Sequence, residues 1–497
     1  MGTMKTPGVY IVEKSAFPNS AVEVATAVPA FIGYTEMALN GNVSLLNKPF
    51  RITSMAEFHA FFGGAPTPKF SLPDAAEGDD PVLTCGEKKV VVKQTSVPFT
   101  LYYQMLMFFG NGGGPCYIVS VGDYTAEEIS ADALKAGIDT LLKEQEPTMV
   151  LCPEAVGIKD KELCFSVQTA MLSHCGYKMR NRVAILDVFD GYKDRRDPAG
   201  DVVNEFREKI GSSFLDFGAA YYPWLNTSIV QDRDLSFLNY DPAELKALLE
   251  EELKRFPEER QALIKEQIDL IGTELDPIAQ DTLQKTLTQV FGIFNAVLKE
   301  TKRQLNLLSP SASMAGIYTM VDNTRGVWKA PANVSVNSVI SPAVNITHDE
   351  QEDLNVPLSG KAINAIRTFV GEGIKVWGAR TLDGNSLDWR YINVRRTMIM
   401  LEESVKNASR AYVFDPNVAS TWINLKSMIQ NFLTGIWKRG GLAGASPEDA
   451  FSVHVGLGDT MTPEDILEGI LRVTVLVAIV RPAEFIEITF QQQMQKS

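Results

Sequence analysis

Two features of this sequence could carry chemistry: a glycine-rich run and an adjacent His–Cys pair. The run Asn111–Pro115 holds three glycines, as in a loop that binds phosphate. A phosphate-binding loop must open a helix and continue into Gly-Lys-Ser/Thr, but here the next segment, Cys116–Val121, has the apolar pattern of a strand. We therefore interpret the glycines as a turn that ends a preceding helix, expected at Thr100–Phe109. The second feature is the adjacent pair His174-Cys175, which would form a thiolate–imidazolium nucleophile only in an unusual local geometry, because neighbours on a helix point about 100° apart.

Four aspartates after a predicted strand resemble a metal loop at first sight: Asp187, Asp190, Asp194 and Asp197. A calcium loop needs oxygen ligands at alternating positions and a glycine at the sixth, and here two arginines lie in the middle of the run. A charged surface loop fits better. The nucleophile-elbow, zinc-protease and dinucleotide-binding motifs are missing from the sequence. We expect no catalytic residue, no cofactor and no metal.

Composition narrows the classes further. The 497 residues carry 47 Lys+Arg against 61 Asp+Glu, a net charge of -14, which argues against nucleic acid or anionic lipid as the main partner. Five cysteines without a repeated CxxC indicate a reducing compartment. The first residues show no signal peptide, and the longest apolar run, 473–480, is shorter than the ~20 residues of a spanning helix. We expect a soluble protein made inside a cell.

The elements that would position any site alternate between strands and helices over residues 125–230. Strands are predicted at Met149–Cys152, Arg182–Val188 and Ala219–Trp224, and helices at Lys161–Cys175 and Val203–Ile210. Continuous apolar strands between helices predict an α/β region with a mainly parallel sheet that is covered on both faces.

Residues 241–305 are rich in Glu, Lys, Leu and Gln at helical spacing. Asp241-Pro242, Pro257 and Asp276-Pro277 predict the starts of three helices. A solvated helical insertion and a partner-binding helix hairpin both remain possible. A second polar segment, 67–95, is interpreted as a loop or small insertion.

The C-terminal part is predicted from the same patterns. Helices are expected at Gly360–Glu372, Tyr391–Ala411, Val418–Trp437 and Pro463–Leu471, and strands at Ile374–Arg380, Phe451–Gly456, Val473–Ile479 and Phe485–Phe490. The last strand and Val9–Val12 lie at opposite ends of the chain. They pair either within their own domain or with another chain, to which a donated strand offers main-chain hydrogen bonds.

Nine segments, in order along the chain, resemble those of contractile tail sheath proteins, either of phage or of extracellular contractile injection systems. They are Thr6–Tyr10, Asn111–Gly113, Tyr221–Trp224, Ser313–Tyr318, Arg325–Asn333, Val376–Leu382, Tyr391–Arg396, Phe414–Asn417 and Arg481–Phe485. The segments 67–95 and 241–305 depart from a minimal phage sheath, and such elaboration is similar to sheaths of extracellular injection systems.

The resemblance implies a structural subunit that polymerises as stacked hexameric rings around an inner tube and contracts without nucleotide hydrolysis to drive the tube through an envelope. Its expected partners are other copies of itself, the inner tube, baseplate and terminator or cap proteins, and sheath paralogues. Assembly is expected in the cytoplasm, as part of a phage-tail-like particle. A baseplate or terminator protein of similar fold, or a soluble α/β enzyme, are the alternatives.

The resemblance also implies a multi-domain α/β fold whose inner domain combines the N- and C-terminal segments. The expected parts are an arm (1–20), the start of the inner or middle domain (21–99), an inserted α/β domain (100–235), an acidic helical insertion (236–312), a C-terminal inner domain (313–483) and a second arm (484–497). Strand exchange between subunits is expected at Val9, Tyr10, Ile11, Val12, Phe485, Ile486, Glu487, Ile488, Thr489 and Phe490. A tube-docking helix is expected at Pro463–Leu471, with Glu464, Asp465 and Glu468 facing basic tube residues; Val418–Trp437 is the competing helix.

Overall fold

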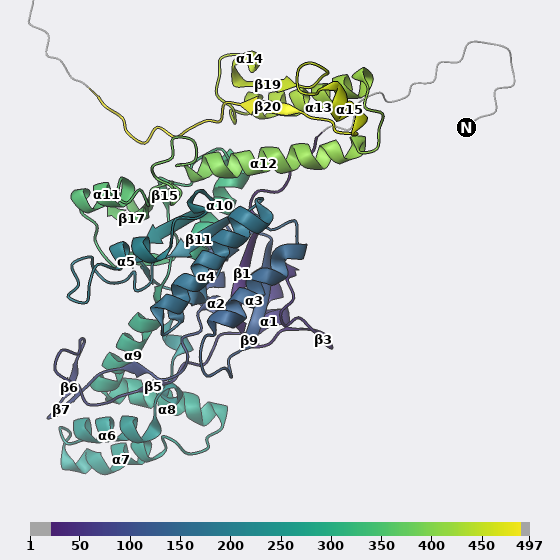
Figure 1. Ribbon diagram of the computed structural model, residues 1–497. Coiled ribbons are helices and arrows are strands. Elements are labelled where there is room, and N and C mark those ends of the chain that lie inside the picture. Colours follow the sequence, from purple (N-terminus) through teal and green to yellow (C-terminus); the bar gives the residue numbers. More distant parts are fainter. Residues whose placement is uncertain (1–20, 489–497) are drawn as a thin grey trace, which may run out of the picture. The chain divides into compact units, whose positions relative to one another are not determined.

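The structure is a computed structural model that describes residues 21–488 (Figure 1). These residues form two compact units. The large unit comprises residues 25–396 and 481–488, and the small unit comprises 21–24 and 397–480. The division falls inside helix α12 (Ile392–Ser409), between Arg396 and Thr397. Residues 313–396, which we expected to pack with the C-terminal segment, therefore pack in the large unit.

Within residues 21–488, nine strands form one sheet in the large unit. In order across the sheet they are β15 (Val334–Ser335), β18 (Gly373–Trp377), β17 (Asn364–Phe369), β12 (Gly218–Tyr222), β11 (Val183–Asp187), β10 (Met149–Leu151), β1 (Pro29–Thr35), β9 (Cys116–Asp123) and β4 (Phe50–Ile52). The strands from β17 to β9 pair in parallel, and β15, β18 and β4 are antiparallel at the two edges. The mainly parallel sheet predicted from the apolar strands is confirmed.

Helices cover both faces of this sheet. Phe31 of β1 meets Phe108 of α2 (Leu101–Gly110), with ring centroids 5.0 Å apart. Its neighbour Ile32 lies against Gly137 of α3 (Ala131–Thr140), where a Cβ atom would stand 2.7 Å from the Ile32 side chain. Successive residues of a strand point to opposite faces, so α2 and α3 lie on opposite sides. Every residue of β1, β10, β11 and β12 is buried, as this arrangement requires.

The remaining elements of the large unit extend these layers. The helices are α1 (Met55–Phe62), α4 (Lys161–Ser173), α5 (Val202–Lys209), α10 (Ser311–Arg325) and α11 (His348–Asn355). Strands β14 (Leu307–Leu308), β13 (Leu225–Thr227) and β16 (Val339–Pro342) form a small sheet, and β2 (Leu39–Asn40) pairs with β3 (Val43–Ser44).

The two segments that we read as insertions, 67–95 and 241–305, pack together as an inserted subdomain of the large unit (Figure 1). It contains α6 (Pro242–Leu253), α7 (Glu258–Asp269), α8 (Pro277–Val290), α9 (Gly292–Leu305), β5 (Phe70–Ser71), β6 (Leu83–Cys85), β7 (Lys88–Val90) and β8 (Lys93–Gln94). Glu244 accepts a hydrogen bond from the Leu72 amide at 2.5 Å, and Gln304 donates to the Val92 carbonyl at 2.9 Å. The side chains of Asp241 and Asp276 cap α6 and α8, and α7 begins directly after Pro257, which confirms all three predicted helix starts.

The small unit holds the C-terminal helices and a two-stranded sheet. Its elements are the rest of α12, α13 (Ala419–Lys438), α14 (Pro447–Ala450), β19 (Phe451–His454), α15 (Pro463–Leu467) and β20 (Thr474–Val477). The buried apolar residues of α13 recur at helical spacing on one face and are Leu425, Met428, Ile429, Leu433 and Ile436. Strands β19 and β20 pair antiparallel, with Ser452 opposite Leu476.

Three predicted elements differ from the structure. The helix predicted at Gly360–Glu372 is wrong, because this segment forms β17 and the turn into β18, with Gly371 and Gly373 at φ of 78° and 81°. Helix α15 ends at Leu467 rather than Leu471, since Gly469 at φ 74° breaks it. The strand predicted at Phe485–Phe490 is not formed in its described part, 485–488, and Thr489 and Phe490 lie outside the described residues.

Candidate assembly site at the C-terminal arm

The C-terminal arm, residues 484–497, begins at Glu484, whose carboxylate accepts four hydrogen bonds. Arg380 donates from Nε to Glu484 Oε1 at 3.0 Å and from Nη2 to Oε2 at 2.5 Å. The Asn355 amide donates to the same carboxylate at 2.7 Å, and the Tyr391 hydroxyl at 3.0 Å. Arg380 is 2% exposed, so this is a bidentate ion pair largely removed from water.

The electrostatics of Glu484 follow from these contacts. Burial by itself would raise the pKa of the carboxyl. The hydrogen bonds from Arg380, Asn355 and Tyr391, together with the charge of Arg380, nevertheless hold that pKa below its usual range. Glu484 is therefore ionised at neutral pH.

Beyond Glu484 the arm exposes apolar side chains. Phe485 is 75% exposed, Ile486 79% and Ile488 69%, and residues 485–488 pair with no strand among the described residues. These residue types favour strands, and an unpaired apolar segment is a ready donor for the edge of a sheet. Of the residues expected in strand exchange, Phe485–Ile488 are thus exposed to solvent. Val9–Val12, Thr489 and Phe490 lie outside the described residues.

The small unit carries a sheet with open edges. Strands β19 and β20 pair with each other, and within residues 21–488 no third strand joins either of them, although Leu442 forms an isolated bridge with Ile479, just beyond the end of β20. Such an edge presents unpaired N–H and C=O groups, and a two-stranded sheet is only marginally stable without further strands or packing. It is therefore suited to accept strands from elsewhere.

The three acidic residues expected to face the tube have different surroundings. The Asp465 carboxylate accepts hydrogen bonds from Arg472 at 3.0 Å and from the Thr462 amide at 3.0 Å, closing the capping box of α15. The Arg472 hydrogen bond is the main reason that the pKa of Asp465 lies below its usual value. Glu464 and Glu468 are exposed, as is Leu467 at 88%. Asp465 thus serves the helix itself, and Glu464 and Glu468 are the carboxylates left facing solvent.

The glycine-rich run at Asn111–Pro115 and the His174-Cys175 pair have structural roles. Asn111 ends α2, and its side chain donates to the Met107 carbonyl at 2.9 Å, as expected for a helix-ending turn. Burial and the charge of Arg182 lower the pKa of His174 to about 4, and burial raises the pKa of Cys175 to about 12. At neutral pH both groups are therefore uncharged, and they form no thiolate–imidazolium pair.

The aspartate run is a surface loop only in part. Asp187 is buried, which corrects our expectation: it accepts hydrogen bonds from the Ser311 amide at 2.9 Å and from the Ser311 hydroxyl at 2.5 Å, at the start of α10. Asp190 pairs with Lys193 at 2.6 Å. Among the described residues there is no group of three or more His, Cys, Asp or Glu arranged to hold a metal ion. No helix in this part of the chain is long and apolar enough to cross a membrane.

The Arg380–Glu484 pair itself was missed from sequence. Both residues lie in segments that resemble sheath proteins, Val376–Leu382 and Arg481–Phe485, but they are 104 positions apart. The resemblance identified both segments, but the sequence of neither one predicts that it contacts the other.

The fold and the C-terminal segment define a class of protein. The model of the phage tail sheath C-terminal domain matches residues 385–493. The tail sheath protein of Enterobacteria phage T4 is 24% identical over 132 residues, 27% of this chain, and the match spans only 20% of the phage protein's own length.

Solved structures match nearly the whole chain. The helical sheath of the anti-feeding prophage in its contracted state is 28% identical, with 99% of this chain and 100% of that chain covered and a TM-score of 0.61. The sheath complex of an extracellular contractile injection system, PVC, in its contracted state is 27% identical, with 99% of each chain covered and a TM-score of 0.60. A chain in the baseplate of the anti-feeding prophage is 27% identical, covering 99% of this chain and 100% of that chain, with a TM-score of 0.61. Over nearly its whole length the chain is thus similar to the subunits of contractile sheaths, and its residues 385–493 match the phage tail sheath C-terminal domain.

Proposed function

We propose that this chain is the structural subunit of a contractile sheath, which polymerises as stacked hexameric rings around an inner tube and contracts to drive the tube through a target envelope. The observation that carries the proposal is the C-terminal arm. It is anchored at Glu484 and then exposes Phe485, Ile486 and Ile488, in a chain that also holds a two-stranded sheet with open edges. The similarity over the whole chain to contracted sheaths supports the same function.

Strand exchange is the proposed means of assembly. Residues 485–490 of one subunit, and 9–12 at the other end of the chain, add strands to the β19–β20 sheets of neighbouring subunits. Each added strand satisfies main-chain groups at an open edge and covers apolar side chains. Contacts of this kind between different surfaces repeat without closing and so build a helical polymer.

Contraction on this proposal is a change of lattice rather than an enzymatic cycle. Many identical interfaces switch from an extended arrangement to a more compact one of lower free energy, and the arms keep the subunits connected. The subunit acts as a structural protein with no catalytic step of its own. Its partners are copies of itself, the inner tube, and the baseplate and cap proteins of a phage-tail-like particle that assembles in the cytoplasm.

Electron microscopy of the purified full-length chain tests the function. We expect long hollow tubes of stacked six-fold rings. Removing residues 485–497 deletes the donated strand but leaves Glu484 in place, so the shortened chain should remain folded by circular dichroism and form no tubes. Tubes of normal length from the shortened chain would contradict strand exchange.

A baseplate or terminator protein is the second candidate, because a chain of the anti-feeding prophage baseplate matches this one about as well as the sheath chains do. The same micrographs separate the two, since a terminator should stop at single rings. Compact monomers at every concentration would contradict both.

We place the tube contact at α15, through Glu464 and Glu468. Replacing both with Lys reverses two exposed charges and leaves the Asp465–Arg472 pair and the capping box in place, so co-assembly with the inner-tube protein should weaken while sheath-only tubes persist. Asp465→Asn is the matched control, because Asp465 is bound to Arg472 within the helix cap. Unchanged sheath–tube particles from the double Lys variant would assign the contact elsewhere, with α13 as the next candidate.

A further inference from the structure

In the described part of the arm, 484–488, the anchor is Glu484, and the structure shows which elements hold it. Arg380 donates to Glu484 through Nε and Nη2, and its remaining nitrogen, Nη1, donates to the Asn355 carbonyl at 2.9 Å. The Asn355 side chain also donates to Glu484. The carboxylate, the guanidinium and the last residue of α11 therefore form a closed set of hydrogen bonds.

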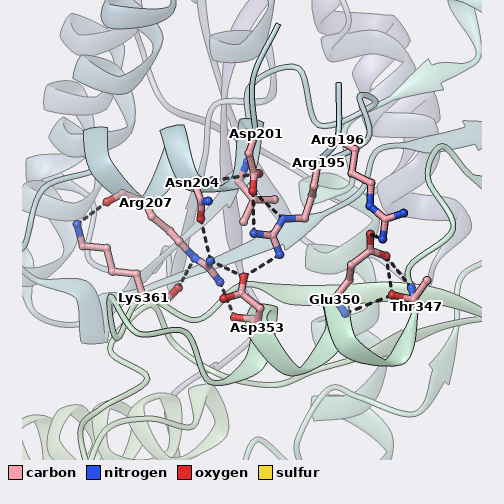
Figure 2. Close-up of polar contacts among 10 residues, drawn as sticks. Arg195, Arg196, Asp201, Asn204, Arg207, Thr347, Glu350, Asp353 and Lys361 are labelled. Carbon is pink, nitrogen blue, oxygen red and sulfur yellow. Dashed lines mark hydrogen bonds and ion pairs between the residues drawn. The ribbon is translucent and has the colours of Figure 1, made fainter. Parts of the chain in front are cut away.

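Helix α11 is also held in place by Asp353, which binds two arginines (Figure 2). Asp353 Oδ2 accepts from Arg195 Nη1 at 2.7 Å and from Arg207 Nη1 at 2.8 Å, and the Asp353 carbonyl accepts from Arg207 Nη2 at 2.7 Å. Arg207 lies on α5 and its side chain is 4% exposed. Through Asp353, the helix that carries Asn355 is joined to the helical layer over the sheet.

The start of α11 is fixed as well. Thr347 and Glu350 close a capping box, with the Thr347 amide donating to Glu350 Oε2 at 2.8 Å. Arg196 reaches the same Glu350 at 3.4 Å, so both ends of this short helix are held by side chains of other elements or by its own cap (Figure 2).

Arg380 has a second connection, through its backbone. Its amide donates to Asn364 Oδ1 at 2.7 Å, and Asn364 Nδ2 donates back to the Arg380 carbonyl at 2.8 Å. Asn364 begins β17 and also donates to the Ala220 carbonyl of β12 at 3.2 Å. The anchor is thus joined directly to the central parallel sheet.

We propose that Arg380, together with Asn355 and Tyr391, is the positioning site of the C-terminal arm. This site binds Glu484 and so makes Phe485 the first residue that can exchange between subunits. When a neighbouring subunit binds the arm, the force on Glu484 passes to the central sheet through Asn364 and to α5 through α11. This inference rests on the proposed function, because a pull arises only where the arm is donated.

The anchor is first tested in the unassembled chain. A spin label on Cys introduced at Phe485 reports motion one residue beyond Glu484, and the five native cysteines are buried, so background labelling is low. Below the concentration at which tubes form, Arg380→Met should narrow the electron paramagnetic resonance line by freeing the arm. Arg481→Met is the matched control, because Arg481 contacts the Leu387 carbonyl at 2.7 Å and Asp388 at 3.6 Å but does not contact Glu484; its line should stay unchanged. Equal line widths in wild type and Arg380→Met would overturn the anchor.

Assembly is the second measurement, made without the label. With the arm no longer pre-ordered, Arg380→Met should raise the concentration for half-maximal tube formation about tenfold. Glu484→Gln, which keeps the side-chain shape, should act in the same direction and serves if Arg380→Met fails to fold. The exchanged pair Arg380→Glu with Glu484→Arg should restore part of the loss, which a purely structural defect would not allow. A freed arm with unchanged assembly would overturn the positioning role, whereas an absence of tubes from the wild-type chain would refute the proposed function and leave the spin-label result standing.

Discussion

Two buried arginines of the large unit, Arg395 and Arg396, are each held by a carboxylate and an aromatic ring, which for Arg396 is that of Tyr318 at 4.6 Å. Arg395 is stacked between Trp389 and Phe217, with its guanidinium 3.7 Å and 4.3 Å from the two ring centroids, and it forms an ion pair with Asp216. Arg396, the next residue, pairs with Asp322 at 2.6 Å, and the two side chains are 4% and 2% exposed. Each guanidinium is held by a carboxylate and an aromatic face together, so the first turn of α12 is fixed in the large unit.

Breaking the Arg396–Asp322 pair should be costly. Asp322→Asn leaves the charge of Arg396 buried without its counterion, for which we expect a loss of about 3 kcal/mol in the free energy of unfolding. Urea denaturation followed by tryptophan fluorescence measures it. The matched control is Asp281→Asn, whose pair with Lys285 is 61% and 69% exposed and should change stability by no more than ~0.5 kcal/mol. Equal effects of the two substitutions would show that the buried pair does not stabilise the fold.

At the scale of elements, short sequence patterns predicted most helices and strands. They did not predict which segments pair with each other when these lie far apart in the sequence. Asp241 and Asp276 cap helices because their side chains reach amides two or three residues away, a geometry that sequence spacing specifies. The helix predicted at 360–372 does not form, because the strand character of this segment depends on pairing with β12 and β18, which no local pattern contains. The same limit hid the anchor of the arm, since Arg380 and Glu484 meet only in the folded chain.

The packing of the two insertions is the clearest case of such a long-range pairing. Cys85 of β6 and Leu248 of α6 are each 1% exposed, and the Cys85 sulfur lies 4.0 Å from the Leu248 carbonyl oxygen. Segment 67–95 is polar overall, yet it contributes the buried residues Leu72, Cys85 and Val90 to a core shared with the helices. The inserted subdomain therefore should behave as one cooperative element.

This unity can be measured by hydrogen exchange. Leu248→Ala leaves a cavity in the shared core and should lower the stability of the subdomain by about 2–5 kcal/mol. The backbone amides of residues 83–90 should then exchange roughly a hundredfold faster, although the substitution lies in α6. Leu263→Ala, on α7 of the same subdomain, removes a side chain that is 66% exposed and should leave the exchange unchanged. Protection of 83–90 that is insensitive to Leu248→Ala would show that the two insertions fold separately.

At the scale of the whole molecule, the C-terminal arm and the two-stranded sheet belong to different units. The arm begins in the large unit at Glu484, and the β19–β20 sheet belongs to the small unit. A chain built in this way can hold its neighbours by main-chain hydrogen bonds while the units themselves stay folded. The net charge of -14 fits this role, because like charge on the exposed surface of a large polymer opposes aggregation.

The most direct test of strand exchange is a mixing experiment with two singly substituted chains. One carries Ile488→Cys in the arm, and the other carries Cys at Ser452 of β19 or, separately, at Leu476 of β20. The native cysteines are buried and should not compete. The proposed strand exchange, in which the arm of one subunit joins the sheet of another, predicts disulfide-linked dimers in mixed tubes with at least one of the two acceptor positions. No cross-link should form in tubes of either variant alone or in unassembled mixtures. Mixed tubes that form normally yet give no cross-link at either position would contradict the account.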